Sequence, residues 1–262
     1  MAIHPSAIVH PNATLGDVRV GPYAVIGEHV TLADGVVIGA HAVIDGVTTL
    51  GPRCVVHPHA VLGGVPQDLS HDGSNTALVV GRENQFREFS TVHCGSSSGT
   101  GTTIIGDNNY FMCASHVAHD CVVGSHTQFA NGATIAGHVS VGDRSVIGGL
   151  AGVHQYVQIG KAVMIGAGAI CTQDLPHFSM VHGDRACLVG VNLVGLRRLG
   201  VPKERFTEIN SAWRALFDGT KPSAIAAANF DTGQGSCDEV LALLQFVRQS
   251  KRGIASFKGS IG

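Results

Sequence analysis

One pattern constrains the fold of this chain more than any other: an apolar residue stands at every sixth position. The longest run of this pattern extends without a break from Ile105 to Cys171. A second run extends from Val20 to Leu62, and three earlier residues keep the same spacing one residue out of phase, namely Ile3, Val9 and Leu15. A period of six matches neither an α-helix nor a coiled coil. The pattern therefore excludes a helical fold for this part of the chain.

The period of six predicts an all-β, left-handed parallel β-helix built from hexapeptide repeats. Each hexad forms one short strand and a turn, and three hexads form one triangular coil of about 18 residues. The apolar residue of each hexad points inward, where only stacking on neighbouring coils buries it. The composition agrees, because 35 of the 262 residues are Gly and only 14% are charged. Gly accepts the backbone conformations that tight corners require.

Two segments interrupt the coils and are expected to form loops, residues 63–79 and residues 93–104, because they are rich in Gly, Ser, Asp and Thr. Long loops in a compact fold often carry function. From about residue 190 the apolar spacing becomes helical, and helices are expected over residues 191–199, 203–217, 222–230 and 237–249. We therefore expect a β-helix over residues 1–184, followed by a small α-helical C-terminal domain over residues 185–262 that caps it.

The charge of the chain is distributed unevenly between these two parts. Residues 1–184 carry a net charge of −7, whereas residues 185–262 carry +5. A basic domain beside an acidic body indicates an acidic partner or ligand near the C-terminal part. The chain has no basic runs typical of a nucleic-acid-binding protein. No secretion signal and no apolar stretch of about 20 residues is visible, so we expect no membrane span.

The seven cysteines are odd in number, widely spaced and without a CxxC motif. They argue against a disulfide framework and against a cysteine-rich zinc site. The expected location is therefore the reducing cytoplasm.

The 18-residue coil aligns a set of polar residues along one edge of the prism. Positions 18 apart stack directly in a parallel β-helix, about 4.8 Å from each other. Residues 115–120, 136–138 and 153–155 therefore share one edge in three successive coils. That edge holds His116, His119, Asp120, His138, His154 and Gln155.

Three interpretations of this edge are open. It can be a solvated polar corner, or it can be a metal site, since three imidazoles can bind Zn²⁺. It can also perform acid–base catalysis, with His119 as the general base beside Asp120. Arg197 and Arg198 likewise fit either a solvated helix face or a phosphate-binding pair.

Several motifs inside and after the hexads give the chain a family resemblance. They are IHPSAIVHPNA at residues 3–13, GVPQDL at 64–69, SHVAHDC at 115–121, AGHV at 136–139, GVHQ at 152–155, and GVN with GLRR at 190–198. With these motifs the chain resembles, nearly end to end, the acyl-carrier-protein-dependent UDP-N-acetylglucosamine O-acyltransferases of lipid A synthesis. Hexads alone indicate only the wider hexapeptide-repeat transferase superfamily.

The resemblance implies a homotrimer with active sites between subunits and an acyl carrier protein as partner. It implies transfer of a 3-hydroxyacyl group from the phosphopantetheine of that carrier to the 3-hydroxyl of UDP-N-acetylglucosamine, with no metal and no other cofactor. In such a reaction His119 takes the hydroxyl proton and Asp120 orients the imidazole. The backbone N–H of Gly137 is the candidate donor to the oxyanion.

The resemblance also implies contacts with the substrates. Gln67, Asp68, His116 and His138 would bind the acceptor, the last three of them at its sugar. His154, Gln155 and Asn192 would lie around the nucleotide or the pantetheine arm, and Arg198 would contact a phosphate or the pantetheine. Met164 and Ala167 lie where the acyl chain would end.

The sequence departs from the family at four positions where charged residues are usual: Ser70, Cys94, Val194 and Leu199. These departures leave the acceptor open between UDP-N-acetylglucosamine and the acceptor of a divergent paralogue, another nucleotide sugar or an amine. An alternative of another class is a zinc-dependent hydratase on the same fold. A purely structural solenoid would leave the aligned histidines unexplained.

Overall fold

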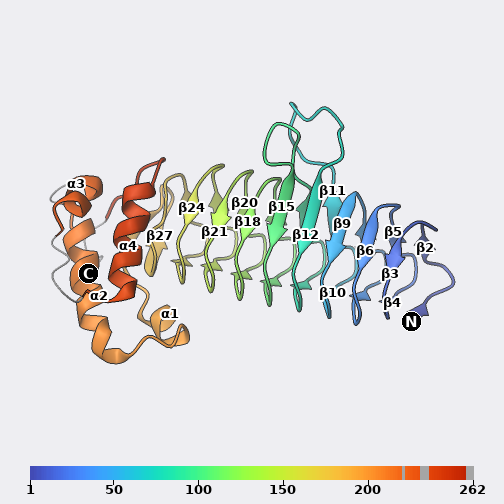
Figure 1. Cartoon of the computed structure of the whole chain (residues 1–262), viewed down its shortest axis with the longest axis horizontal. Helices are drawn as coiled ribbons and strands as arrows, with labels where there is room; N and C mark the ends of the chain where they lie inside the picture. The colour runs from blue at the N-terminus through green and yellow to red at the C-terminus, as the bar shows by residue number, and fades with distance from the viewer. Residues whose placement is uncertain (220–221, 231–235, 258–262) are drawn as a thin grey trace.

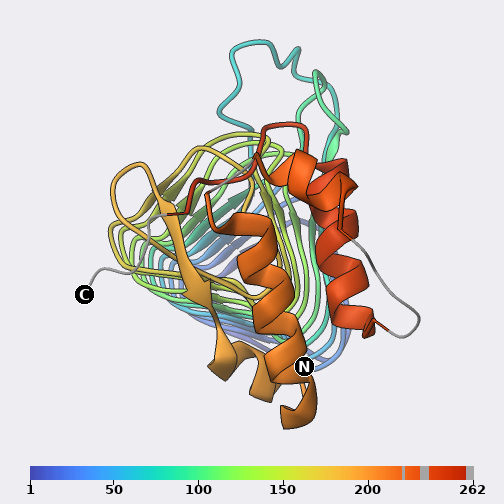
Figure 2. The ribbon, with the colours of Figure 1, turned by 90° about the vertical axis from the view of Figure 1, so that its left-hand side faces the viewer.

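A computed structural model of the chain describes residues 1–219, 222–230 and 236–257. Short strands wind into a long triangular prism, and helices cover the end of the prism that is reached last by the chain (Figures 1 and 2). The predicted left-handed parallel β-helix with a C-terminal helical part is confirmed. Among the described residues no helix is long and apolar enough to cross a membrane.

Within the described residues the strands form three sheets, one for each face of the prism. The first sheet contains β1 (Ala2–Ile3), β4 (Arg19–Val20), β7 (Val37–Ile38), β10 (Val55–Val56), β13 (Gln85–Phe86), β16 (Tyr110–Phe111), β19 (Gln128–Phe129), β22 (Val146–Ile147), β25 (Met164–Ile165), β27 (Ser179–His182) and β28 (Cys187–Val191). The second contains β2 (Ile8–Val9), β5 (Val25–Ile26), β8 (Val43–Ile44), β11 (Val61–Gly64), β14 (Thr91–His93), β17 (His116–Val117), β20 (Thr134–Ile135), β23 (Gly152–Val153) and β26 (Ile170–Cys171). The third contains β3 (Thr14–Leu15), β6 (Val30–Leu32), β9 (Val47–Leu50), β12 (Ala77–Val80), β15 (Thr102–Ile105), β18 (Val122–Val123), β21 (Ser140–Val141) and β24 (Gln158–Ile159).

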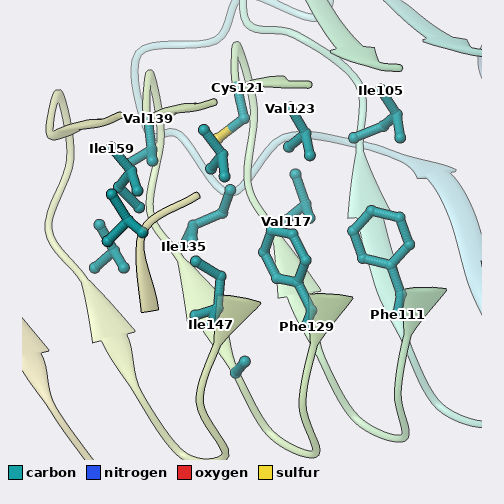
Figure 3. Close-up of a cluster of buried hydrophobic side chains, with 14 of the residues drawn as sticks. Ile105, Phe111, Val117, Cys121, Val123, Phe129, Ile135, Val139, Ile147 and Ile159 are labelled. Carbon is teal, nitrogen blue, oxygen red and sulfur yellow. The ribbon is translucent and has the colours of Figure 1, made fainter. Parts of the chain in front are cut away.

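The core follows the sequence period. Phe111 pairs with Phe129, and Phe129 pairs with Ile147, each 18 residues further along the chain. These side chains are buried and stack along the inside of the prism (Figure 3). The first coil is one residue shorter, because Ile3 pairs with Val20. That shorter coil explains why the first hexads are out of phase.

We name the corners of the prism by the sheets that they join. The first corner leads from the first sheet to the second, the second corner leads from the second sheet to the third, and the third corner leads back to the first. At the second corner of three successive coils the backbone adopts the left-handed conformation at Asp120, His138 and Tyr156, with φ of 59°, 63° and 66°. The fold thus places non-glycine side chains in a conformation that glycine usually supplies.

Both predicted loops leave the prism at the second corner. Residues 65–76 connect β11 to β12, and residues 94–101 connect β14 to β15. Paired residues on either side of each loop are more than 18 positions apart, since Leu62 pairs with Val92 and Val92 pairs with Val117. The loops are therefore insertions into otherwise regular coils. In the view along the prism the two loops rise together from one corner (Figure 2). The loops are therefore neighbours of the histidine-bearing turns.

The helical part begins after one more hairpin. β27 pairs with β25 in parallel, and β28 pairs with β27 antiparallel, so the first sheet continues past residue 184. The described helices are α1 (Leu193–Arg198), the 3₁₀ turn η1 (Lys203–Arg205), α2 (Phe206–Phe217), α3 (Ser223–Ala228) and α4 (Asp238–Gln249). The helix expected over residues 191–199 starts later, because the Asn192 side chain caps it by accepting the Gly195 N–H at 2.9 Å.

The helices are anchored on the prism by buried contacts. The Trp213 indole N–H donates to the Ser179 hydroxyl at 3.0 Å, and the indole is buried. The His177 ring packs against Phe246 of α4, with 4.9 Å between the ring centroids. Of the segment assigned to the helical domain, residues 220–221, 231–235 and 258–262 lie outside the described residues.

Candidate active site

His119 and Asp120 form the centre of the second corner. The Nδ1 atom of His119 lies 2.7 Å from Oδ2 of Asp120, and the Asp120 side chain has no exposed surface. Because Nδ1 donates to the carboxylate, Nε2 is the ring nitrogen left to accept a proton. The pair has the arrangement of a general base and the carboxylate that orients it.

The loop of residues 94–101 wraps around the Asp120 carboxylate. The carboxylate accepts hydrogen bonds from the backbone N–H groups of Ser96 and Gly101 and from the Thr100 hydroxyl, at 2.9 to 3.0 Å. Burial opposes the charge of Asp120, but the hydrogen bonds from His119, Thr100 and Ser96 outweigh it and keep the pKa of the carboxyl below its usual value. Asp120 is therefore an ionised carboxylate with a fixed position.

His138 lies one coil further on, beside the His119–Asp120 pair. Its ring meets the His119 ring edge to face, with centroids 5.0 Å apart, and its Nδ1 lies 3.9 Å from Oδ2 of Asp120. Burial lowers the pKa of His138, although the charge of Asp120 opposes that change. The His138 ring is therefore neutral at pH 7 and can both donate and accept a hydrogen bond.

Gly137 fits closely over the His119 ring. A Cβ atom at this position would lie 2.6 Å from Cε1 and Nε2 of His119, nearer than real Cβ atoms approach other atoms. Within the described residues the Gly137 N–H makes no hydrogen bond to another protein group. An N–H without a partner, in a residue that packs on the His119 ring, can serve as a hydrogen-bond donor to an oxyanion.

Asp68 connects the two loops above this corner. Its carboxylate accepts hydrogen bonds from the hydroxyls of Ser96 and Ser98, at 2.6 and 2.5 Å, and from the hydroxyl and N–H of Ser70. These hydrogen bonds hold the pKa of Asp68 well below its usual value. The negative charge of Asp68 also favours the protonated form of His138, so this loop residue interacts electrostatically with the second corner.

His116 lies on β17, the strand that leads into this corner. Its Nδ1 lies 2.7 Å from the Thr91 hydroxyl, and its ring meets that of His93 edge to face at 4.9 Å. His93 is buried, its Nδ1 has no partner among the described residues, and burial lowers its pKa to about 4. Burial also lowers the pKa of His116. Both rings are therefore neutral at pH 7.

The remaining residues expected at this corner are solvent-facing. His154 and Gln155 are exposed on the next coil, where the His154 Nδ1 contacts the Gln155 carbonyl at 3.2 Å. Gln67 is exposed on the loop of residues 65–76. All three are available to a ligand that approaches the corner from outside.

Four expected substrate residues lie elsewhere in the single chain. Met164 is on β25 in the first sheet, which is the face opposite the second corner, and Ala167 is exposed at the first corner. The Asn192 amide donates to the Ala162 carbonyl at 2.8 Å, at the third corner. Arg198 lines a polar hollow of about 260 Å³ together with His126 and Arg144. One chain alone does not bring these four residues to His119.

Three side chains of the second corner could offer ligands to a metal ion. The donor atoms of His119, Asp120 and His138 lie within 4.8 Å of one another. Two imidazoles and one carboxylate are ligands that Zn²⁺ accepts. A metal ion there would have to replace the proton that joins His119 to Asp120. With that hydrogen bond in place, the same side chains are arranged for proton transfer.

The four unusual positions have ordinary structural environments. The Ser70 hydroxyl donates to Asp68 at 2.7 Å, and Cys94 is buried with its Sγ 3.4 Å from the Gly63 carbonyl. Val194 is exposed on α1, and Leu199 packs against the core. Among these, only Ser70 contacts a residue of the second corner that we expect to bind substrate.

The structure adds residues that the sequence analysis missed. Ser96, Ser98 and Thr100 belong to a loop without periodicity, so their contacts with the two aspartates could not be foreseen. Tyr156 stacks on His138 with parallel rings, 4.3 Å between centroids. Its position was available from the sequence, because Tyr156 follows His138 by one coil.

Comparisons with known proteins identify the family. The protein-family model described as domain 2 of UDP-N-acetylglucosamine O-acyltransferase matches residues 174–255. The family model of the bacterial transferase hexapeptide matches residues 16–46 and 102–137. An acyl-carrier-protein–UDP-N-acetylglucosamine O-acyltransferase of Stenotrophomonas maltophilia is 41% identical, over 95% of this chain and 96% of the relative. The enzyme of that name from Thiobacillus denitrificans is 42% identical, over 96% and 98%.

Solved structures agree with the sequence relatives. A crystal structure of a UDP-N-acetylglucosamine acyltransferase superposes with a TM-score of 0.94 at 35% identity, covering 98% of this chain and all of the other. The structure of LpxA from Acinetobacter baumannii superposes with a TM-score of 0.93 at 35% identity, covering 97% of this chain and all of the other. The chain thus belongs to the family of acyl-carrier-protein-dependent UDP-N-acetylglucosamine O-acyltransferases.

Proposed function

We propose that this chain transfers a 3-hydroxyacyl group from acyl carrier protein to the 3-hydroxyl of UDP-N-acetylglucosamine, the first step of lipid A synthesis. The observation that supports this most directly is the second corner itself. There His119 is bound to the buried carboxylate of Asp120, and Gly137, whose N–H has no partner among the described residues, packs closely against the same ring. Membership of the family supports acyl carrier protein as the acyl donor and UDP-N-acetylglucosamine as the acceptor.

The reaction that fits this geometry begins at Nε2 of His119. The sugar hydroxyl loses its proton to Nε2 while its oxygen attacks the carbonyl carbon of the thioester. The imidazolium that forms is stabilised by Asp120, and the oxyanion accepts a hydrogen bond from Gly137. Collapse of this intermediate breaks the carbon–sulfur bond, and the leaving thiolate takes the proton from His119.

We also propose that the working unit is a homotrimer whose active sites lie between subunits. Asn192, Arg198, Met164 and Ala167 lie on parts of the chain that do not adjoin the second corner. A neighbouring subunit placed against the second corner would bring its own copies of these residues to His119. This arrangement supports their roles around the nucleotide, the pantetheine arm and the end of the acyl chain.

The acyl carrier protein is the partner whose charge suits the C-terminal part. Residues 185–262 carry a net charge of +5. Within them, Arg197, Arg198 and Lys203 are exposed. Clustered exposed cations raise the association rate of an acidic partner.

Product analysis tests the proposed function. Purified protein is incubated with 3-hydroxyacyl carrier proteins of several chain lengths and with a panel of nucleotide sugars, including one that carries an amine. Mass spectrometry is expected to find the 3-O-acyl product of UDP-N-acetylglucosamine. A product formed only from another acceptor would support the divergent paralogue, which the substitutions at Ser70, Val194 and Leu199 favour.

A mixing experiment tests the shared site. A variant that lacks His119 and a variant that lacks Arg198 are each expected to be weakly active. If the site lies between subunits, mixed trimers contain sites with both residues and regain part of the activity. Mixed trimers that stay as inactive as the two parents would contradict the shared site.

A further inference from the structure

Asp120, His138 and Tyr156 occupy equivalent positions in three successive coils. Each is the left-handed residue of the second corner, with φ between 59° and 66°, and each follows the previous one by 18 residues. Their side chains therefore leave the backbone in the same direction, one above another. Asp120 and His138 are already placed in the site, so the third member of the row is the one without a role.

Tyr156 contacts both residues that the coil before it contributes to the site. Its ring lies parallel to the His138 ring, with 4.3 Å between centroids and 2° between planes. Its backbone N–H donates to the Gly137 carbonyl at 3.1 Å. His138 in turn donates its backbone N–H to the His119 carbonyl at 3.0 Å. The three coils are thus linked in one row that ends at the base.

The His138 ring depends on packing for its orientation. Within the described residues no side-chain hydrogen bond fixes it, and its Nδ1 is 3.9 Å from Asp120, beyond hydrogen-bond distance. The two ring contacts, edge to face with His119 and parallel with Tyr156, are what hold it. Tyr156 is itself about half exposed, and its ring covers one face of the His138 imidazole.

We propose that Tyr156 is a positioning residue that holds the His138 imidazole against the His119–Asp120 pair by ring stacking. The inference rests on the proposed function and on the role at the acceptor sugar that the family resemblance implies for His138. A stacked aromatic pair contributes about 0.5–1.5 kcal/mol beyond its buried area. Loss of the Tyr156 ring is therefore expected to reduce kcat/KM for the acceptor by about 2- to 10-fold.

The titration of His138 offers a readout that does not require turnover. The groups that act on it are His119, Asp120 and Asp68, together with the phenol of Tyr156, which packs on its face. Burial lowers the pKa of His138, and the Tyr156 ring supplies part of that burial. Removal of the ring lets water reach the imidazole and is expected to raise its pKa toward the ordinary value.

The test compares Tyr156→Leu with Tyr156→Phe. Leucine fits a left-handed corner position, as Leu150 shows at the first corner with φ of 58°. We expect Tyr156→Leu to raise KM for the nucleotide sugar and leave KM for the acyl carrier protein unchanged. We expect Tyr156→Phe, which keeps the stack, to behave like wild type. In an NMR titration the His138 pKa should rise only in the leucine variant.

The chain supplies a matched control in Tyr23. Tyr23 also stacks on a histidine, His41, with centroids 5.0 Å apart, and it also has a left-handed backbone, with φ of 58°. It lies between β4 and β5, in the N-terminal coils of the prism and far along the chain from the coils that carry His119 and Ala167. Tyr23→Leu removes an equivalent stack and is expected to leave both KM values unchanged. An equal loss in the Tyr23 and Tyr156 variants would show a general loss of stability and would overturn the proposal.

Two other outcomes would overturn it as well. Tyr156→Leu could keep wild-type kinetics and an unchanged His138 titration, or Tyr156→Phe could lose as much as Tyr156→Leu, which would assign the effect to the hydroxyl. If wild type formed no acylated sugar at all, the proposed function would fail separately. The NMR titration of His138 would still decide whether Tyr156 positions the ring.

Discussion

Nδ1 of His119 lies 2.7 Å from Oδ2 of Asp120, and this contact makes Nε2 the ring nitrogen that can receive a proton. The carboxylate is itself fixed by N–H and O–H donors from residues 96–101. His119, the proposed base, is therefore oriented by a buried carboxylate whose own position depends on a loop.

Replacing the base should remove turnover without unfolding the protein. His119→Ala deletes the proton acceptor, and a positioned acid–base group typically contributes about 10²–10⁴-fold. The side chain lies at a corner of the prism and outside its apolar core, so the melting temperature should change little. Steady-state assays and thermal denaturation measure the two effects. A variant that retained a tenth of wild-type turnover would show that another residue is the base.

Gly137→Ala should damage the site through sterics. The added methyl group would lie 2.6 Å from the His119 ring, so the ring must move away from Asp120 or from the acceptor. We expect kcat to fall about 100-fold, because displacing a reacting group by about 1 Å costs about that much. Gly149→Ala is the control, because its nearest neighbour would be 3.4 Å away. Similar activity in both variants would contradict a close fit of His119 under Gly137.

Reversing the charge of exposed cations in the helical part should weaken binding of the acyl carrier protein. Arg197→Glu or Lys203→Glu should raise KM for the acyl carrier protein more than it lowers kcat. The effect should shrink at higher salt, because exposed charges are screened over about 8–10 Å at ionic strengths of 0.10–0.15 M. Arg19→Glu, an exposed change in the N-terminal coils, is the control. A loss that did not depend on salt would indicate damage to folding of the helical part.

Restoring the usual charged residues should strengthen acceptor binding. Each hydrogen bond to a charged group contributes about 1.5–3 kcal/mol. Calorimetry with UDP-N-acetylglucosamine should therefore show tighter binding by Ser70→Lys/Val194→Glu/Leu199→Arg than by wild type. Equal affinities would mean that Ser70, Val194 and Leu199 do not weaken binding of UDP-N-acetylglucosamine, so that the usual family acceptor stands.

Acid should destabilise the junction between the prism and α4. Burial, with a smaller effect of Lys161, lowers the pKa of His177 to about 4, whereas an unfolded chain takes up the proton near pH 6.5. The unfolded state therefore binds more protons between these values, and the free energy of unfolding falls as pH drops from about 6.5 to 4. Over this pH range, protonation of His177 is expected to lower the free energy of unfolding by on the order of 2 kcal/mol.

His177→Asn tests this contribution, because asparagine does not titrate in that range. Urea unfolding at pH 7 and pH 4.5 measures the difference. The variant should lose less stability than wild type between the two values. An identical pH dependence would assign the acid sensitivity to other groups, such as His93.

The sequence period predicted the coil and the alignment of His119 with His138, since both follow from stacking at 18 residues. The same arithmetic places Tyr156 over His138, although the motif that marks this coil ends at Gln155. The contacts of Asp68 with Ser96 and Ser98 could not be predicted, because they join two loops that have no period. Strand β28 was missed because the period ends near Pro176 and strand pairing alone extends the sheet.

The pairing register has a consequence for how such a protein can change over generations. Coils on either side of the two loops keep their alignment, since Leu62 pairs with Val92 and Val92 with Val117 despite the inserted residues. An insertion within a strand would shift every later side chain off its row, whereas an insertion at the second corner leaves the rows intact. Lineages can therefore lengthen or rewrite the cover over His119 while inheriting the prism beneath it unaltered.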